Sequence, residues 1–187
     1  MDTLAYMIEM RRHLHRMPEL SLQEKETAAF IREQLKALGY EPVAIADTGT
    51  YTDFIVDPEK PWLLFRADID ALPVTEETGL PFASEHPGKM HACGHDGHMA
   101  VCAALCRVLD ALSEEEKSKA KRNALVLFQS GEESAGGAEA VVDSGILAET
   151  RTDRIFALHL WPKLKKGEVY STAGVCLAQN AEVDITI

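Results

Sequence analysis

The stretch Ala124-Leu125-Val126-Leu127-Phe128-Gln129-Ser130-Gly131-Glu132-Glu133 is an apolar run that ends in a glycine and two adjacent carboxylates. Its length and apolar character predict a buried strand over residues 124–129. Adjacent strand residues point to opposite faces, so both glutamates reach one site only if the chain turns at Gly131, where the missing Cβ permits a turn. The stretch therefore predicts a buried strand with an acidic pair at its carboxyl end.

Helices and strands alternate on both sides of this segment. Apolar residues spaced three to four apart predict helices over residues 3–16, 97–112 and 137–144, with Asp96 as the N-cap of the second. A capping-box pattern, Ser21-Leu22-Gln23-Glu24, predicts a further helix that ends at Gly39. Short apolar segments predict strands at residues 43–46, 53–56, 62–67, 154–160 and 168–172. The alternation predicts an α/β fold, a mostly parallel mixed sheet flanked by helices.

Two polar segments interrupt this pattern. Residues 68–89 contain several prolines and glycines, which predict an ordered loop. Residues 113–122 are rich in charge and predict a solvated connector.

Chemically active side chains occur at or near the carboxyl ends of three predicted strands. Asp68 and Asp70 follow one strand, Glu132 and Glu133 follow another, and His159 lies at the end of a third. Open α/β sheets place their ligand sites at this edge, so we expect these groups to share a site.

The segment Met90-His91-Ala92-Cys93-Gly94-His95-Asp96-Gly97-His98 concentrates imidazole, thiol and carboxyl groups, which bind transition metals. Cys93 and His95 are two residues apart, which in an extended segment points both side chains toward one ion. His91 and His98 are either direct ligands or hydrogen-bonding groups that fix the orientation of a ligand. The segment predicts a metal site.

The other candidates each have an alternative role. In the pair Glu132-Glu133 one carboxylate can bind metal while the other acts as a general base toward water, or both can belong to a solvated acidic loop. His159 is a ligand or a satisfied core histidine, and the two other clusters favour the ligand. Asp68 and Asp70 orient ligand histidines, bind metal directly or cap Asx turns.

Composition limits the classes of partner. The chain has 187 residues, 46% of them hydrophobic and 26% charged, which is typical of a globular domain. A net charge of −11 argues against nucleic acid and anionic membranes as partners. We expect no membrane span and no signal peptide, and the four scattered cysteines favour a reducing cytoplasm over a disulfide framework.

Several segments resemble the amidohydrolase branch of the aminoacylase-type dinuclear metallopeptidases, which includes hippurate hydrolases, auxin-conjugate hydrolases and N-acetyldiaminopimelate deacetylases. The string MHACGHDGH is the most specific of them, and the segments occur in the order found in that family. They are residues 11–21, 66–73, 90–98, 128–133 with 136–138, and Leu158-His159 with Pro162.

The resemblance implies a site that holds two divalent metal ions, manganese, zinc or nickel. It makes Cys93, His95, Glu133 and His159 metal ligands and Glu132 the general acid and base. Asp70 becomes an outer-shell carboxylate, and Asp68 and His98 are further outer-shell candidates. The implied activity is hydrolysis of the amide bond of N-acyl amino acids. The alternatives are a dipeptidase or carboxypeptidase with the same centre, or a metal-binding fragment without activity.

The resemblance also implies a domain organisation. Residues 1–178 would form the N-terminal part of the catalytic domain, and residues 179–187 the first strand of an inserted lid or dimerisation domain. A further ligand histidine is expected in the C-terminal part of family members, and a homodimer is expected to form through the lid.

Overall fold

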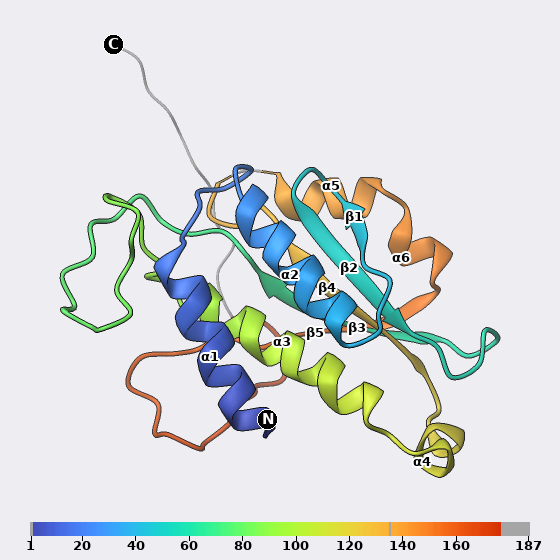
Figure 1. The fold of residues 1–187 in the computed structure, drawn as a ribbon. Coiled ribbons are helices and arrows are strands. Elements are labelled where there is room, and N and C mark those ends of the chain that lie inside the picture. The colour runs from blue at the N-terminus through green and yellow to red at the C-terminus, as the bar shows by residue number, and fades with distance from the viewer. Residues whose placement is uncertain (1, 135, 177–187) are drawn as a thin grey trace.

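A computed structural model describes residues 2–134 and 136–176 and contains a five-stranded sheet with helices on both faces (Figure 1). The elements in chain order are α1 (Thr3–Arg16), α2 (Lys25–Ala37), β1 (Val43–Ile45), β2 (Gly49–Phe54), β3 (Trp62–Asp68), α3 (His95–Asp110), α4 (Glu114–Lys119), β4 (Asn123–Gln129), α5 (Gly137–Asp143), α6 (Ile146–Glu149) and β5 (Thr152–Ala157).

The strands follow the order β1-β2-β4-β3-β5. Strand β3 lies between β4 and β5 and is parallel to both. Strand β2 is antiparallel to both of its neighbours, so among these five strands it alone runs against the rest. The predicted α/β fold with a mostly parallel mixed sheet is confirmed.

The central strand β4 is buried along its whole length because helices cover both of its faces. Val126 and Phe128 pack in a core with residues of α1, α2 and α3. Leu125 and Leu127 point the other way and pack with Val141 of α5 and with α6. Burying each such side chain contributes roughly 1.5–3 kcal/mol, so the alternation along β4 holds the three layers together.

Helix α1 has the predicted bounds. Asp2 caps its start by accepting a hydrogen bond from the Leu4 N–H, and Pro18 follows its end. Tyr6, Met10 and Leu14 form the buried stripe that packs toward α3.

Two predicted helix starts are wrong. Helix α2 begins at Lys25, and Ser21 forms no capping box because the side chains of Ser21 and Glu24 bond to distant loops. Helix α3 begins at His95 with Gly94 at the N-cap, where φ is 88°. Asp96 is therefore in the first turn, and its carboxylate pairs with α1 instead of capping α3.

The connector predicted at residues 113–122 contains the short helix α4. Its capping box is complete: the Ser113 hydroxyl accepts from the Glu116 N–H, and the Glu116 carboxylate accepts from the Ser113 N–H. The helix buries no residue, so this local capping and its side-chain pairs, such as Lys119 with Glu115, account for it.

Three strand predictions need correction. Strand β2 begins at Gly49 instead of residue 53 because it pairs with β1 as well as β4. Strand β5 ends at Ala157, the last of its residues that pairs with β3, opposite Arg66. His159 therefore follows the strand instead of lying in it. Residues 168–172 form no strand: within the described chain no neighbour pairs with them, and Val169 is 85% exposed.

The predicted loop over residues 68–89 is confirmed, and isolated bridges between Leu20 and Ala71 and between Leu72 and Met90 order it. The strand expected at residues 181–187 lies outside the described residues. Among the helices of the described ranges, none has the length and apolar character needed to cross a membrane.

Candidate metal centre

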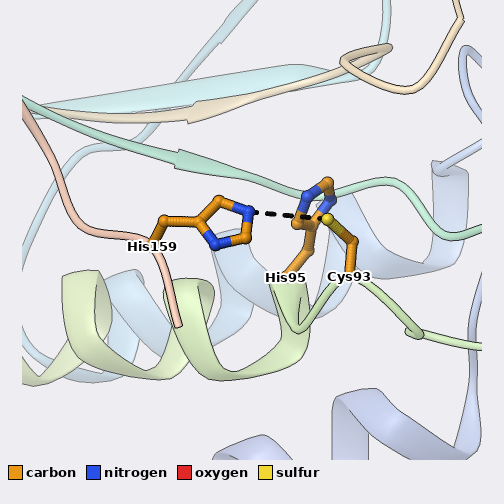
Figure 2. A group of neighbouring side chains, drawn as sticks. All are labelled: Cys93, His95 and His159. Atoms are coloured by element: carbon orange, nitrogen blue, oxygen red, sulfur yellow. Dashed lines mark hydrogen bonds between the residues drawn. The ribbon is translucent and has the colours of Figure 1, made fainter. Parts of the chain in front are cut away.

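The carboxyl ends of three neighbouring strands meet at one edge of the sheet. Asp68 ends β3, Gln129 ends β4 and Ala157 ends β5, and these strands are parallel. Residues that follow these strands lie near His95, the first residue of α3. They are Asp70 after β3, Glu132 and Glu133 after β4, and His159 after β5, which Figure 2 shows beside Cys93 and His95. The fold therefore brings together the groups that the sequence analysis singled out.

Cys93, His95 and His159 form the centre of this site. One ligand atom of each lies within 4.8 Å of those of the other two, as metal ligands do. The Cys93 Sγ atom is 3.5 Å from His159 Nε2, the contact dashed in Figure 2. His159 Nδ1 donates to the carbonyl oxygen of Leu160 at 2.8 Å, which leaves the Nε2 lone pair directed at the thiol.

His95 has the same tautomer. Its Nδ1 donates to the carbonyl oxygen of Asp70 at 2.8 Å, so Nε2 carries the lone pair. That nitrogen is buried and has no hydrogen-bond partner among the described residues. It faces Glu132 Oε2 and Glu133 Oε1, each 3.8 Å away. Repulsion between this lone pair and the two carboxylates is relieved by a proton on Nε2 or by a cation among the three groups, and the donor atoms fit a metal ion.

The two glutamates reach the site because the chain turns at Gly131, where φ is +64°. The Glu133 N–H donates to Asp70 Oδ2 at 2.8 Å, and the buried Glu133 Oε1 has no partner in the described part of the chain. The Glu132 side chain is 41% exposed and that of Glu133 is 20% exposed. The pair thus divides into an outer carboxylate that water can reach and an inner one beside the imidazole.

Asp70 is a completely buried carboxylate that orients this centre. Its Oδ2 accepts from Ser21 Oγ at 2.6 Å, and its Oδ1 lies 3.4 Å from His95 Nδ1. Burial by itself would raise the pKa of Asp70, but hydrogen bonds from His95, Ser21 and the Glu133 backbone lower it to about 2. The group therefore stays ionised and holds the His95 ring in place.

Asp68 lies on the rim of the centre, buried and paired with Arg66. Burial raises its pKa, and the Arg66 guanidinium opposes that rise. A ligand atom of Asp68 comes within 4.8 Å of those of His95 and His98, so these three residues form a second group that could hold an ion.

His98 and His91 differ in their contacts. His98 Nε2 accepts the Leu160 N–H at 3.0 Å, so this lone pair is already occupied. His91 is buried, belongs to none of the ligand groups found among the described residues, and neither ring nitrogen has a hydrogen-bond partner there. Burial lowers the pKa of both histidines to about 4. Both rings are therefore neutral at physiological pH.

The acidic surroundings also act on the thiol. Burial raises the pKa of Cys93 to about 12, and the charges of Glu133 and Glu132 add to the rise. A divalent cation would reverse that effect and stabilise the thiolate. Nitrogen, sulfur and carboxylate donors together suit manganese, zinc or nickel, so the residues present fit a metal centre.

Sequence reasoning missed several residues that support the site. Ser21 and Glu24 were assigned to a helix cap, and Asp96 was assigned to another. Asp96 instead accepts from His15 Nδ1 at 2.8 Å and from Arg11 Nε at 3.0 Å, which fixes the first turn of α3 against α1. The only signal was that residues 11–21 belong to the segments that carry the family resemblance.

An α/β sheet with this cluster of donors at the carboxyl ends of its strands is the arrangement of a metal-binding α/β protein. The model of peptidase family M20/M25/M40 matches residues 64–186, and the chain belongs to that family.

The relatives and solved structures agree with this assignment. N-acetyldiaminopimelate deacetylases from Listeria monocytogenes serotype 4a (strain HCC23) and Bacillus velezensis (strain DSM 23117) are 41% and 39% identical, over 96% and 97% of this chain and 47% of each relative. The crystal structure of the YXEP protein of Bacillus subtilis, a dinuclear metal-binding peptidase, is 38% identical with a TM-score of 0.79, over 87% of this chain and 44% of that one. The chain spans about half the length of the curated relatives it matches.

Proposed function

We propose that the complete protein is a metal-dependent amidohydrolase that cleaves the amide bond of an N-acyl amino acid. The observation that carries this proposal is the buried Nε2 of His95, whose lone pair faces Glu132 and Glu133. With Cys93 and His159 beside it, this arrangement offers imidazole, thiol and carboxylate donors to a single cation.

In the proposed centre, Cys93, His95, Glu133 and His159 hold two divalent ions. When bound, the ions supply Lewis-acid chemistry that polarises an amide carbonyl and makes water more acidic. The donor set is compatible with manganese, zinc and nickel alike.

Glu132 is the proposed general base and acid. Its greater exposure leaves the carboxylate open to water, while its Oε2 stays 3.8 Å from His95. Glu132 takes a proton from the attacking water and passes it to the leaving nitrogen, and the amide C–N bond breaks to give a carboxylate and a free amine. Asp70, held by Ser21 and the Glu133 N–H, keeps the His95 ring oriented throughout.

A cavity beside the centre gives the substrate a place to bind. It has a volume of about 420 Å³ and includes Cys93 and His159 in its wall. Leu160, Trp161 and Pro162 supply an apolar surface, which suits an acyl chain or a hydrocarbon side chain. The deacetylase names of the relatives favour an N-acetyl amino acid, N-acetyldiaminopimelate among them.

The test is a substrate panel assayed with the complete, metal-loaded protein. We expect turnover of N-acetyl amino acids, and we expect Glu132→Gln to abolish it without loss of metal. Turnover of free dipeptides alone would assign the centre to a dipeptidase instead. If the protein bound metal but hydrolysed neither N-acetyl amino acids nor dipeptides, it would be a metal-binding protein without this activity.

We further propose the cytoplasm as its compartment and a homodimer as its assembly. The free thiols of Cys93, Cys102, Cys106 and Cys176 support a reducing compartment. The homodimer rests on the family resemblance alone, and sedimentation of the complete protein tests it.

A further inference from the structure

We propose that residues 19–24, which we call the strap, position the metal centre by cross-linking the loop after β3 to the turn after β4. Within the strap, Glu24 is the positioning residue for the Glu132-Glu133 pair. The strap precedes α2 and contacts none of the candidate ligands through its own side chains in the hydrogen bonds described above.

One end of the strap binds the loop that follows β3. The Ala71 N–H donates to the Glu19 carbonyl oxygen at 2.8 Å, and Leu20 forms a parallel bridge with Ala71. Ser21 Oγ then donates to Asp70 Oδ2 at 2.6 Å. The strap therefore holds the residue that orients His95.

The other end binds the turn that follows β4. Glu24 Oε1 accepts from the Gly131 N–H at 2.9 Å, and its Oε2 accepts from the Thr48 hydroxyl. Glu24 is fully buried, so water cannot replace either donor. Its Oε1 fixes the peptide between Ser130 and Gly131, one residue before Glu132, and its Oε2 ties the same side chain to Thr48.

Packing reinforces this second contact. A Cβ at Gly131 would come within 2.8 Å of Leu22 Cδ2, so the strap presses directly on the turn. Leu22 itself has a φ of 61°, a left-handed conformation that is unfavourable for a residue with a Cβ atom. The strained residue persists because its neighbours on the strap are anchored at both ends.

The strap thus adds a cross-link between the two strand ends beyond their last paired residues, Asp68 and Gln129, where the Ile69 N–H also donates to the Gln129 carbonyl oxygen. Through Asp70 it sets the His95 ring, and through Gly131 it sets the two glutamates. The Glu133 N–H closes the connection by donating to Asp70 Oδ2. A loss at Glu24 should therefore change the geometry of the centre without removing a ligand.

The matched pair of variants is Glu24→Gln and Glu26→Gln. Glutamine removes the carboxylate charge that strengthens both hydrogen bonds, and at position 24 it keeps both partners only if the Thr48 hydroxyl turns from donating to accepting. Glu26 is an exposed carboxylate in the first turn of the same helix, so its substitution controls for charge and for α2 stability.

Two readouts test the strap in the complete protein. Hydrogen exchange of the Gly131 amide should speed up at least tenfold in Glu24→Gln and stay unchanged in Glu26→Gln. Titration with Co²⁺ alone should show an altered visible spectrum and an affinity lower by about 10- to 100-fold, the usual effect of a lost outer-shell contact. An unchanged Gly131 exchange rate together with an unchanged Co²⁺ spectrum would overturn the proposal.

The inference about catalysis rests on the proposed function, and the two can fail separately. If the wild-type protein bound no Co²⁺, the proposed function would fail, while Gly131 exchange would still decide whether Glu24 holds the turn. If Co²⁺ binds, kcat should fall in Glu24→Gln while KM for the N-acetyl amino acid stays near wild type. A rise in KM alone would contradict a positioning role.

Should Glu24→Gln not fold, Thr48→Val provides the second test. It removes one donor to Glu24 at a half-buried position and keeps the side-chain shape. The same two readouts should move in the same direction by a smaller amount. A folded Thr48→Val with wild-type exchange and a wild-type Co²⁺ spectrum would then overturn the proposal.

Discussion

His98 Nε2 accepts a hydrogen bond from the backbone N–H of Leu160 at 3.0 Å, which ties α3 to the chain that follows β5. That chain contributes His159 to the candidate centre, and the ring centroids of His98 and His159 are 4.6 Å apart. Because His159 lies beyond the last residue of β5, the sheet does not fix it. The hydrogen bond from Leu160 to His98 therefore helps to position His159, a candidate metal ligand, although His98 itself is expected to lie outside the first coordination shell.

We predict that His98→Ala weakens metal binding by about 10- to 100-fold, as the loss of an outer-shell contact commonly does. Isothermal titration with Zn²⁺ measures the change, and a thermal melt checks that the variant folds. His86→Ala is the matched control, since His86 Nδ1 donates to the carbonyl oxygen of Pro18 and His86 belongs to none of the ligand groups found among the described residues. Equal Zn²⁺ affinity in wild type and His98→Ala would show that His159 is held by other means.

The adjacent glutamates should separate in their effects. Glu132→Gln should lower kcat by about 10²- to 10⁴-fold, the usual contribution of a general base, and leave metal content near wild type. Glu133→Gln should lower metal content, because its inner carboxylate is the one with a buried, unpartnered oxygen. Elemental analysis of metal content, together with steady-state kinetics, distinguishes the two variants. If Glu132→Gln lost metal and Glu133→Gln kept it, Glu133 would be the general base and Glu132 the ligand.

The location of the site could be predicted from sequence because it depends on a general property of α/β sheets. Apolar runs ending at Asp68 and Gln129 define parallel strands, and the groups that follow such strands meet at one edge. Gly131 was equally predictable, since two adjacent carboxylates need a turn to share a site and only glycine adopts a φ of +64° at little cost.

The supporting contacts could not be predicted, because the same local pattern has two physical outcomes. Ser113 and Glu116 form a capping box with each other, whereas the similar pattern at Ser21 and Glu24 does not. The second pair bonds to Asp70, Thr48 and Gly131, which are distant in sequence and come near only after the sheet has formed. Tertiary hydrogen bonds in a buried setting outweigh an exposed cap.

Metal affinity should depend steeply on pH through Cys93. Without a metal, burial and the charge of Glu133 raise the pKa of the thiol to about 12, so binding a cation must release its proton. We predict that affinity for Zn²⁺ rises as pH rises from about 6 to 8, with a shallower rise in Cys93→Ser. Competition titration with a chromophoric chelator measures both, and identical pH slopes would remove Cys93 from the ligand set.

Stability should fall with rising pH through His15. A hydrogen bond to Asp96 is the main cause that raises the pKa of His15 above 6.5, and it outweighs the opposing effect of burial. A raised folded-state pKa stabilises the fold fully below pH 6.5, and that contribution is lost as pH rises through the folded-state value. Urea unfolding between about pH 5.5 and 8 should show this decline in wild type and a flatter curve in His15→Gln. Parallel curves would contradict it.

Gly131→Ala should cost more than backbone strain alone. Alanine at a φ of +64° costs roughly 1–2 kcal/mol, and its Cβ would also meet Leu22 Cδ2 at 2.8 Å. Gly39→Ala is the matched control, because φ there is +87° and a Cβ would find no atom within 4 Å. We predict that Gly39→Ala lowers the free energy of unfolding by about 1 kcal/mol and leaves Zn²⁺ affinity unchanged. Gly131→Ala should lose somewhat more stability than that, because the end of the exposed Leu22 side chain must also move. It should bind Zn²⁺ more weakly as well, because the backbone strain falls on the turn that carries Glu132 and Glu133. If both variants lost the same stability and kept wild-type Zn²⁺ affinity, contact with Leu22 would have no part in placing the acidic pair.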